Sequence, residues 1–504
     1  MNHYELLLTH MGTVLQMQYL VPLLVGTIAG VIGGALPGVT ITMTVIVVLP
    51  FTFGLDPLQG LAAMIGVYVG GSAGGSITAS LIGIPGTPSA VATTFDGFPM
   101  AQKGRAGEAL TAAFTSSFVG ALFAVLLITF LAPLVAKFAL KFGPPEYFAI
   151  QLLTFCSFVG MGREPPAKTI ASMMLGFALA AVGLDTVTGT LRMTFGQTQL
   201  LQGFDFLVAV IGLFGLGEIF LTMEEGLSFK GTRAKIDFNI VWRTWKTLPR
   251  YWVTSLRSCL VGCWMGITPG GATPASFMSY GMARRFSKTG GKFGDGEIEG
   301  VIAPETAAHA AGTSALLPML TLGIPGSPTA AVLLGGLLIW GLQPGPLLFV
   351  EKKEFVWGLI ASMYLGNIVG LLIVLTTVPW WAAILRIPFA IIAPVIVVIC
   401  AIGAYTVHNN MFDVVMMLVF GVVGYVFKKL KYPLAPLVLA LVLGDMAETS
   451  FRQSMLISGG SMTIFYANGL VGSIVTLALI LLSWPLVSRV LGLLRKRPVE
   501  PKEA

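Results

Sequence analysis

Hydroxyl side chains cluster beside four motifs in which Gly and Pro interrupt apolar sequence. The motifs are "GALPG" (residues 34–38), "GIPG" (83–86), "GITPG" (266–270) and a second "GIPG" (323–326). Proline cannot donate a backbone hydrogen bond and glycine permits sharp turns, so each motif predicts a broken helix. Backbone N–H groups at a helix start attract anions, and freed carbonyl groups attract Na⁺. With the neighbouring hydroxyls, these groups could bind an anion and a cation.

The predicted substrate- and ion-binding residues are the motif residues and the polar side chains around them. In chain order they are Pro37, Gly38, Thr40, Thr42, Ser76, Pro85, Gly86, Thr87, Ser89, Pro269, Gly270, Thr273, Ser276, His309, Thr313, Ser314, Pro325, Gly326, Ser327 and Thr329. Unwound backbone at membrane depth must be buried in protein or line a polar cavity, because lipid cannot satisfy its hydrogen bonds. We therefore predict that the two "GIPG" breaks face each other across a polar pocket.

Close helix packing is the alternative explanation for many of the glycines. Gly66, Gly70 and Gly74 recur at every fourth residue, which is the small-residue spacing that lets membrane helices approach each other. One helix can serve both purposes, so both interpretations stay open.

Neither catalysis nor metal binding is indicated by the reactive side chains. Cys259 and Cys263 could share a helix face, but no His or carboxylate stands beside them as a zinc site requires. The segment "GGSAGGS" (residues 70–76) lacks the Lys of a phosphate-binding loop. The prediction is therefore a protein with no catalytic residues, no side-chain metal ligands and no cofactor beyond a coupling ion.

The composition predicts the elements that must position these motifs. Of 504 residues, 55% are apolar and 11% charged, whereas a soluble domain has about 25% charged residues. Uncharged runs at residues 110–136, 355–385 and 453–488 exceed the roughly 20 residues that a membrane-spanning helix needs. The predicted fold class is an all-α polytopic membrane protein with roughly ten to fourteen membrane segments.

The order of the motifs predicts an internal repeat. Each half has one "PG" motif followed, after a similar interval, by "GIPG". We predict two homologous halves with broken or re-entrant helices, and an inverted arrangement is the commoner one for transporters. The expected segments are an N-terminal segment (1–18), a first transmembrane repeat (19–225), a basic connecting segment (226–251), a second repeat (252–450), a C-terminal membrane segment (451–488) and a tail (489–504).

Basic residues predict the orientation in the membrane. The formal charge of +7 comes from Lys and Arg gathered in short loops, such as residues 284–288, 428–431 and 495–497. The positive-inside rule assigns these loops to the cytoplasm and explains them better than nucleic-acid binding does. The C-terminus is therefore predicted to be cytoplasmic.

Carboxylates within apolar sequence are further candidates, since charge is costly in lipid. Asp56 and Asp96 stand in Pro- and Gly-rich sequence and are predicted to cap loops. Glu305 follows a proline, so we expect it in the first turn of a helix. Glu218 is expected either within the membrane or at a helix end.

The quoted motifs also carry a family resemblance. The stretch from "LPGVTITMTV" to "GIPGTPSAVATTFDGFPMAQKGRAGEAL" (residues 36–110), with "GITPGGATPASFMSYGMARRFSK" and "APETAAHAAGTSALLPMLTLGIPGSPTAAVLLGG", resembles the large membrane subunit of tripartite tricarboxylate transporters. One departure is the pair Ala308 and His309, where many members have two asparagines. If that pair contacts substrate or ion, specificity or coupling differs here, because His can titrate near neutral pH.

The resemblance implies a function. Such subunits are permeases of the bacterial inner membrane that work with a small four-helix membrane subunit and a periplasmic substrate-binding protein. They import organic acids such as citrate, usually with Na⁺. We therefore predict a binding-protein-dependent secondary transporter for tricarboxylates or related acids, and the alternatives are a passive anion channel or a membrane-embedded enzyme.

Overall fold

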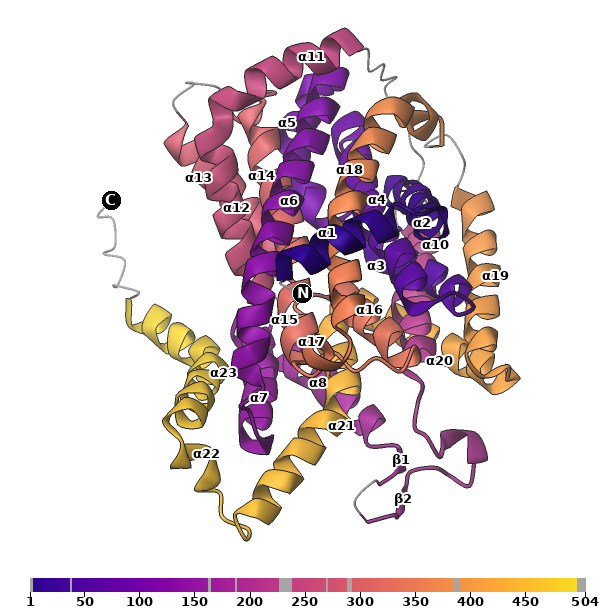
Figure 1. Ribbon diagram of the computed structural model, residues 1–504, viewed down its shortest axis with the longest axis vertical. Helices are drawn as coiled ribbons and strands as arrows, with labels where there is room; N and C mark the ends of the chain where they lie inside the picture. The colour runs from indigo at the N-terminus through magenta and orange to yellow at the C-terminus, as the bar shows by residue number, and fades with distance from the viewer. Residues whose placement is uncertain are drawn as a thin grey trace, which may run out of the picture. The chain divides into compact units, whose positions relative to one another are not determined.

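The computed structural model is almost wholly helical (Figure 1). It describes residues 3–36, 39–161, 165–185, 188–225, 238–268, 271–287, 292–384 and 389–495. The chain divides into two units, and each is described by itself. The first comprises Met1–Lys141 and Thr194–Leu430, and the second Phe142–Met193 and Lys431–Ala504.

The first unit holds all four Gly-Pro motifs. Its elements up to residue 141 are α1 (His3–Val14), α2 (Met17–Ala35), α3 (Ile41–Val48), η1 (Leu49–Thr52), α4 (Pro57–Ile82), η2 (Pro88–Ala90), α5 (Val91–Gln102) and α6 (Ala106–Ala139). Those from residue 194 onward are η3 (Thr198–Leu200), α9 (Phe206–Val210), η4 (Ile211–Leu216), α10 (Gly217–Glu225), α11 (Phe238–Thr247), η5 (Leu248–Tyr251), α12 (Trp252–Ile267), α13 (Ala272–Phe286), α14 (Glu299–Ser314), α15 (Leu316–Leu322), α16 (Pro328–Ile339), α17 (Leu348–Glu351), α18 (Lys353–Ile384), α19 (Phe389–His408) and α20 (Met411–Lys429).

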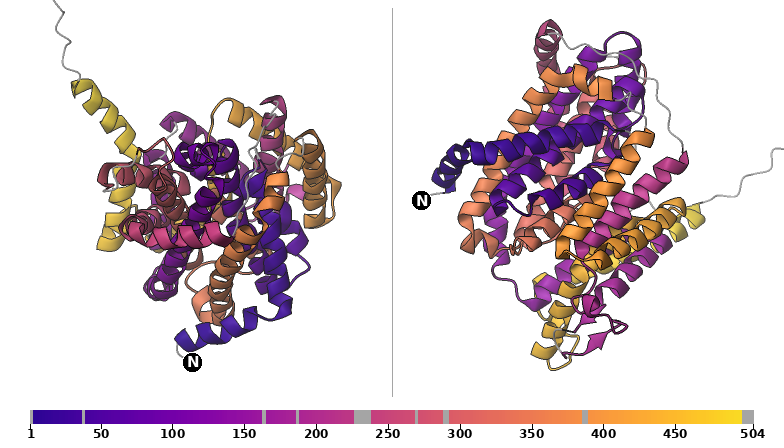
Figure 2. Two further views of the ribbon diagram at one scale, coloured as in Figure 1. Left: turned by 90° about the horizontal axis from the view of Figure 1, so that it is seen from above. Right: turned by 90° about the vertical axis from the view of Figure 1, so that its right-hand side faces the viewer.

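Two peripheral helices mark the edges of this unit. The N-terminal helix α1 packs beside α18, and the marked N-terminus lies at the margin of the unit in the views of Figure 2. Helix α11 lies across the end of α6 (Figure 1), where the Trp245 indole donates to the Thr115 hydroxyl at 2.9 Å.

The second unit is a smaller helical group. Its elements are α7 (Pro144–Met161), α8 (Pro166–Ala180), α21 (Leu434–Ile457), α22 (Ile464–Ala467), α23 (Gly469–Arg495) and a short antiparallel hairpin of β1 (Gly183–Leu184) and β2 (Leu191–Arg192). Phe155, Met173 and Leu443 pack together in its core. Asp185 beside the hairpin forms ion pairs with Arg192 and with Arg452 of α21, which ties the hairpin to that helix.

Seven helices in the described part of the chain are long and apolar enough to cross a membrane. They are Met17–Ala35, Pro57–Ile82, Ala106–Ala139, Phe206–Glu224, Lys353–Thr377, Met411–Lys429 and Leu434–Ile457. Shorter apolar helices include Ala393–His408 and Gly469–Pro485. The all-α architecture predicted from composition is confirmed, and the number of roughly ten to fourteen membrane segments stays a prediction.

Glycines bring α2 and α4 into backbone contact. A Cβ atom at Gly66 would overlap the carbonyl oxygen of Leu23, and one at Gly70 would overlap that of Thr27. A Cβ atom at Gly74 would lie 2.6 Å from the carbonyl oxygen of Val31. The close-packing interpretation of this glycine stripe is therefore confirmed, since any side chain here would force the two helices apart.

A second helix pair in the same unit is built the same way. Gly262 of α12 lies against the carbonyl group of Ala307 in α14, and one turn later Gly266 lies against that of Ala311. On the other side of α14, Gly120 of α6 lies against the carbonyl group of Thr306. The backbone of α14 is therefore in close contact with both α12 and α6.

Helix caps explain where α4 begins. Asp56 accepts from the backbone N–H of Leu58, and the Gln59 side chain returns to the N–H of Asp56, a capping box with Pro57 in the first turn. The loop-capping role predicted for Asp56 is confirmed.

Both "GIPG" segments interrupt helices with the same backbone conformation. Gly83 ends α4 and Gly323 ends α15, both in the left-handed region, with φ of 70° and 72°. Thr87 and Ser327 are extended, and Pro88 and Pro328 start the next helical turn. Each break therefore places the N-terminal end of a short helix inside the unit.

Candidate functional site

The segments that follow the four motifs are joined in a crossed pattern. Thr42, which follows the first motif, shares a hydrogen bond of 2.8 Å with Thr329, which follows the second "GIPG". The Ser276 hydroxyl, after the third motif, donates at 2.7 Å to the carbonyl oxygen of Ser89, after the first "GIPG". Each "GIPG" segment therefore meets the other half of the chain.

These contacts bring helix beginnings together. Helix α3 packs against α16, and α13 packs against η2 and α5. Thr40 caps α3 by accepting from the Met43 N–H at 3.2 Å, and Ser327 caps α16 by accepting from the Ala330 N–H at 3.1 Å. The first-turn N–H groups of such helices attract negative charge.

The two break glycines fit against the ends of α2 and α12. A Cβ at Gly86 would overlap the carbonyl oxygen of Gly34, and a Cβ at Gly326 would lie 2.7 Å from that of Gly266. Only glycine fits at either place without a shift of backbone.

The remaining predicted residues have different surroundings. Thr87 and Ser89 share a hydroxyl hydrogen bond of 3.2 Å beside the Pro85 turn, and Pro325 lies in the matching turn. Thr273 is in the first turn of α13 and Thr313 is buried on α14. The Ser314 hydroxyl lies between the carbonyl oxygens of Ala311 and Cys263, so it serves the α12–α14 contact. Pro37, Gly38, Pro269 and Gly270 lie outside the described residues.

Glu305 is the functional candidate whose position the sequence did not predict. It lies in the middle of α14 and not in a first turn, so the expectation that it caps this helix is wrong. Its carboxylate accepts from the hydroxyls of Ser76 at 2.8 Å, Thr93 at 2.6 Å and Ser117 at 3.0 Å. Those residues belong to α4, α5 and α6, so one carboxylate joins four helices.

His309 lies one helical turn beyond Glu305. Its Nδ1 is 3.0 Å from the backbone oxygen of Glu305 and 3.5 Å from the carboxylate atom Oε2. The Glu-x-x-x-His spacing on one helix face was the sequence signal that could have drawn attention to Glu305.

Asp96 fixes the loop between α13 and α14. Its buried carboxylate accepts from the backbone N–H groups of Gly294, Gly296 and Glu297 at 2.8–2.9 Å, and from the Tyr280 hydroxyl at 2.9 Å. The predicted loop-capping role is confirmed, although Asp96 itself lies within α5.

Glu218 lies in the first turn of α10 and pairs with Lys428 at the end of α20. Because α9, η4 and α10 continue as one candidate membrane helix from Phe206 to Glu224, Glu218 lies within this helix and not at its end. Within the described ranges, no group of three or more His, Cys, Asp or Glu side chains is placed to hold a metal ion.

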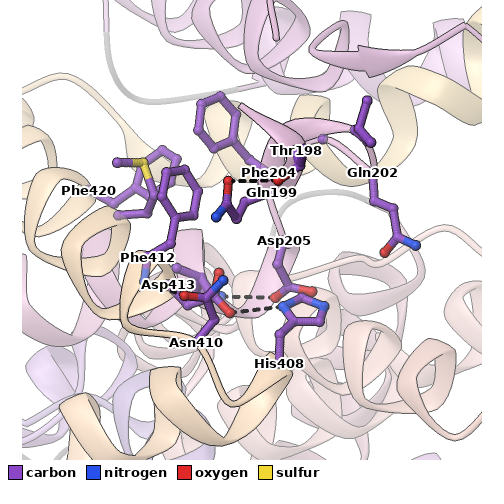
Figure 3. A pocket seen from close by; sticks show the side chains of 14 residues that line it. Thr198, Gln199, Gln202, Phe204, Asp205, His408, Asn410, Phe412, Asp413 and Phe420 are labelled. Atoms are coloured by element: carbon purple, nitrogen blue, oxygen red, sulfur yellow. Dashed lines mark hydrogen bonds and ion pairs between the residues drawn. The ribbon is translucent and has the colours of Figure 1, made fainter. Parts of the chain in front are cut away.

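A separate cavity of about 330 Å³ lies where α9 and α20 begin (Figure 3). Its acidic groups have local structural roles. Asp205 accepts from the first N–H groups of α9, and Asp413 in the first turn of α20 pairs with His408 at 2.9 Å. Burial raises the pKa of Asp205. These carboxylates stabilise helix starts, so we do not assign the transport site to this cavity.

Comparison with known proteins decides the family. Residues 20–439 match the family described as tripartite tricarboxylate transporter TctA. The chain belongs to that family. It is therefore a multi-pass membrane subunit of a tripartite tricarboxylate transporter and not an enzyme, and the resemblance inferred from the motifs is confirmed.

Two relatives of this TctA-family chain come from Agrobacterium vitis. One, described as an uncharacterized 52.8 kDa protein in the TAR-I ttuC' 3' region, is 38% identical over 456 residues, which cover 90% of each chain. The other, an uncharacterized protein in the TAR-II ttuC' 3' region, is 39% identical over 220 residues, 44% of this chain and 91% of the relative. No solved structure matches the chain.

Proposed function

We propose that this membrane subunit is the permease of an importer for tricarboxylates or related organic acids, driven by a Na⁺ gradient. The observation that carries the proposal is the crossed pairing of Thr42 with Thr329 and of Ser276 with Ser89. It joins the starts of short helices from both halves of the chain, where N–H groups can bind carboxylates and freed carbonyls can bind Na⁺.

The two halves, residues 19–225 and 252–450, are proposed to be inverted repeats. In the first half, two glycines of α2 lie against carbonyl groups of α4: Gly30 against Val67 and Gly34 against Gly71. In the second half, two glycines of α12 lie against carbonyl groups of α14 in the same way: Gly262 against Ala307 and Gly266 against Ala311. Helix α3, after the first motif of the first half, packs on α16, after the second motif of the second half. Helix α13, after the first motif of the second half, packs on η2 and α5, after the second motif of the first half. Two equivalent segments related by a two-fold axis would make this crossed arrangement.

Transport then follows from movement of one half against the other. A carboxylate substrate binds at the paired helix starts, and neutral N–H and hydroxyl donors serve where an unpaired Arg would be costly in the membrane. Rocking of the halves about this site would expose it alternately to the two sides of the membrane.

The remaining parts of the system are proposed from the family. A periplasmic binding protein delivers the acid, a small four-helix membrane subunit completes the complex, and both membrane subunits lie in the bacterial inner membrane. The basic loops support a cytoplasmic C-terminus by the positive-inside rule.

Reconstitution of the chain with both partners into liposomes tests the proposal. We expect uptake of a labelled tricarboxylate, such as citrate, that requires the binding protein and rises at least tenfold with an inward Na⁺ gradient. Uptake that ignores imposed Na⁺ and H⁺ gradients would favour a passive channel and overturn the coupled mechanism.

Glycine variants test whether the breaks form the site. Gly86→Val and Gly326→Val should each abolish uptake, because the new side chain would displace the Gly34 or Gly266 carbonyl group. Gly281→Val is the matched control, since a Cβ there meets nothing within 4 Å. Normal uptake by both break variants would remove these turns from the site.

A further inference from the structure

A buried carboxylate and a buried imidazole face each other on α14. The side chain of Glu305 is 2% exposed and that of His309 is 10% exposed. The transport mechanism proposed above uses neither group. An ionisable pair buried among apolar helices is costly to keep, so a functional reason for it should be sought.

The hydrogen bonds of His309 leave one ring nitrogen unused. A backbone carbonyl only accepts, so Nδ1, which lies 3.0 Å from the carbonyl oxygen of Glu305, carries the hydrogen. Nε2 is buried and has no hydrogen-bond partner among the described residues. In the neutral ring, Nε2 is therefore a free base with a carboxylate beside the same ring.

Among the described residues, His309 is the charged or ionisable side chain that contacts the Glu305 carboxylate. Asp96 of α5 is bound by the loop at residues 294–297, Glu299 in the first turn of α14 by the hydroxyls of Thr254 and Ser287, and Arg105, just before α6, by Glu108. The backbone carbonyl of Cys263 on α12 accepts from Ser314 of α14, and the uncharged Tyr68 hydroxyl on α4 lies against Gly312 of α14. In the part of the chain that the structure describes, His309 is thus the one partner of Glu305 that can become positively charged.

The hydroxyls around Glu305 connect the pair to the proposed substrate site. Thr93 stands on α5, just after the first "GIPG", and Ser76 stands beside Gly75, against which the Thr87 side chain packs. A substrate that moves Thr87 or Ser89 would shift the helices that hold Glu305. Binding at the break and the charge state of the pair can therefore influence each other.

We propose that Glu305 and His309 form a proton-binding site that is filled and emptied once in each transport cycle. This inference rests on the proposed transport function. A proton from the water on the substrate's side adds to Nε2 of His309, and the imidazolium is balanced by the Glu305 carboxylate. The same proton leaves Nε2 for water on the other side when the substrate is released, so one proton accompanies each substrate molecule.

Proton movement in proteoliposomes tests the site directly. With a pH-sensitive dye inside, uptake by the complete wild-type complex should acidify the lumen by about one proton per substrate. His309→Gln and Glu305→Gln should abolish this acidification, and the rate of uptake by His309→Gln should vary less than twofold between about pH 5 and 8. His408→Gln, outside the pair, should behave like the wild type.

The outcomes separate the two proposals. Substrate uptake driven by Na⁺ without proton movement would overturn the proton site and leave the proposed transport function standing. An absence of uptake under every gradient would overturn the transport function itself. Acidification that persists in His309→Gln would also overturn the site.

A measurement on the wild type covers the case in which the variants do not fold. Titration calorimetry of the purified complex with substrate, in buffers of different ionisation enthalpy, reports the protons bound with each substrate molecule. About one proton is expected, and a value of zero would contradict the proposal.

Discussion

At the scale of single residues, the binding site that we propose uses hydrogen-bond donors and acceptors from distant segments in place of charged side chains. Thr42 and Thr329, or Ser89 and Ser276, are ordinary hydroxyl residues in isolation. In the proposed site they act together because the starts of their helices are in contact. The Asp96 carboxylate likewise acts on a distant segment, because it accepts hydrogen bonds from three backbone N–H groups of the loop at residues 294–297.

Asp96→Ala should loosen that loop without unfolding the unit. Hydrogen bonds to a charged group contribute about 1.5–3 kcal/mol each, and three backbone N–H groups would lose theirs. Amide exchange at Gly294, Gly296 and Glu297, followed by mass spectrometry, should become at least tenfold faster. Asp295→Ala is the control, because its pairing with Lys103 is exposed and contributes little. Equal exchange in the two variants would contradict the role of Asp96.

Sequence reasoning succeeded at this scale where the signal was local. The capping role of Asp56 depends on neighbours two and three residues away. Glu305 was misplaced because the proline before it suggested a helix start, whereas the helix begins six residues earlier at Glu299 and Pro304 lies inside it. The three hydroxyls that bind Glu305 come from other helices, and no local sequence pattern predicts that these helices meet at Glu305.

At the scale of elements, glycine decides which helices lie closest. The α2–α4 and α12–α14 pairs both depend on carbonyl groups that fit where a side chain would otherwise be. The two "GIPG" segments then end α4 and α15 at Gly83 and Gly323. Close contact and broken helices are therefore two uses of the same residue type.

Gly70→Ala should weaken the α2–α4 pair. The added methyl group would overlap the Thr27 carbonyl oxygen, and overpacking of this kind costs about 1–3 kcal/mol. We expect a melting temperature several degrees lower in a thermal-shift assay of the purified protein. Gly281→Ala should leave it equal or slightly higher, because space is open there and alanine favours the helix. A drop of the same size in the control would contradict the packing argument.

At the scale of the whole molecule, composition and motif order were enough for the class and the family. Long apolar helices follow from hydropathy alone, and the family follows from the motifs. The crossed pairing of the segments after the motifs could not be predicted, because it depends on which helices pack together over long sequence separations. The division between the two units also has no marker in composition, since both are apolar and helical.

The proposed topology predicts which ends of the helices are cytoplasmic. All four native cysteines are buried, so they should react little with maleimide, and labelling of an introduced cysteine can be measured above their background. A cysteine at Lys246 should react with a membrane-impermeant maleimide only after the cells are opened. A cysteine at Asn410, at the other end of the 19-residue helix that finishes at Lys429, should react in intact spheroplasts. Reversed labelling would invert the proposed orientation.

The crossed hydroxyl pairs also have a consequence for biosynthesis. Thr42 and Thr329 are separated by 287 residues, and Ser89 and Ser276 by 187. At a synthesis rate of about 5–20 residues per second, Thr42 waits roughly 15–60 seconds for its partner. A first half that enters the bilayer during that time lacks the hydroxyl partners from the second half. A chain truncated before Thr329 should accordingly be degraded by quality-control proteases and not persist as half of a permease.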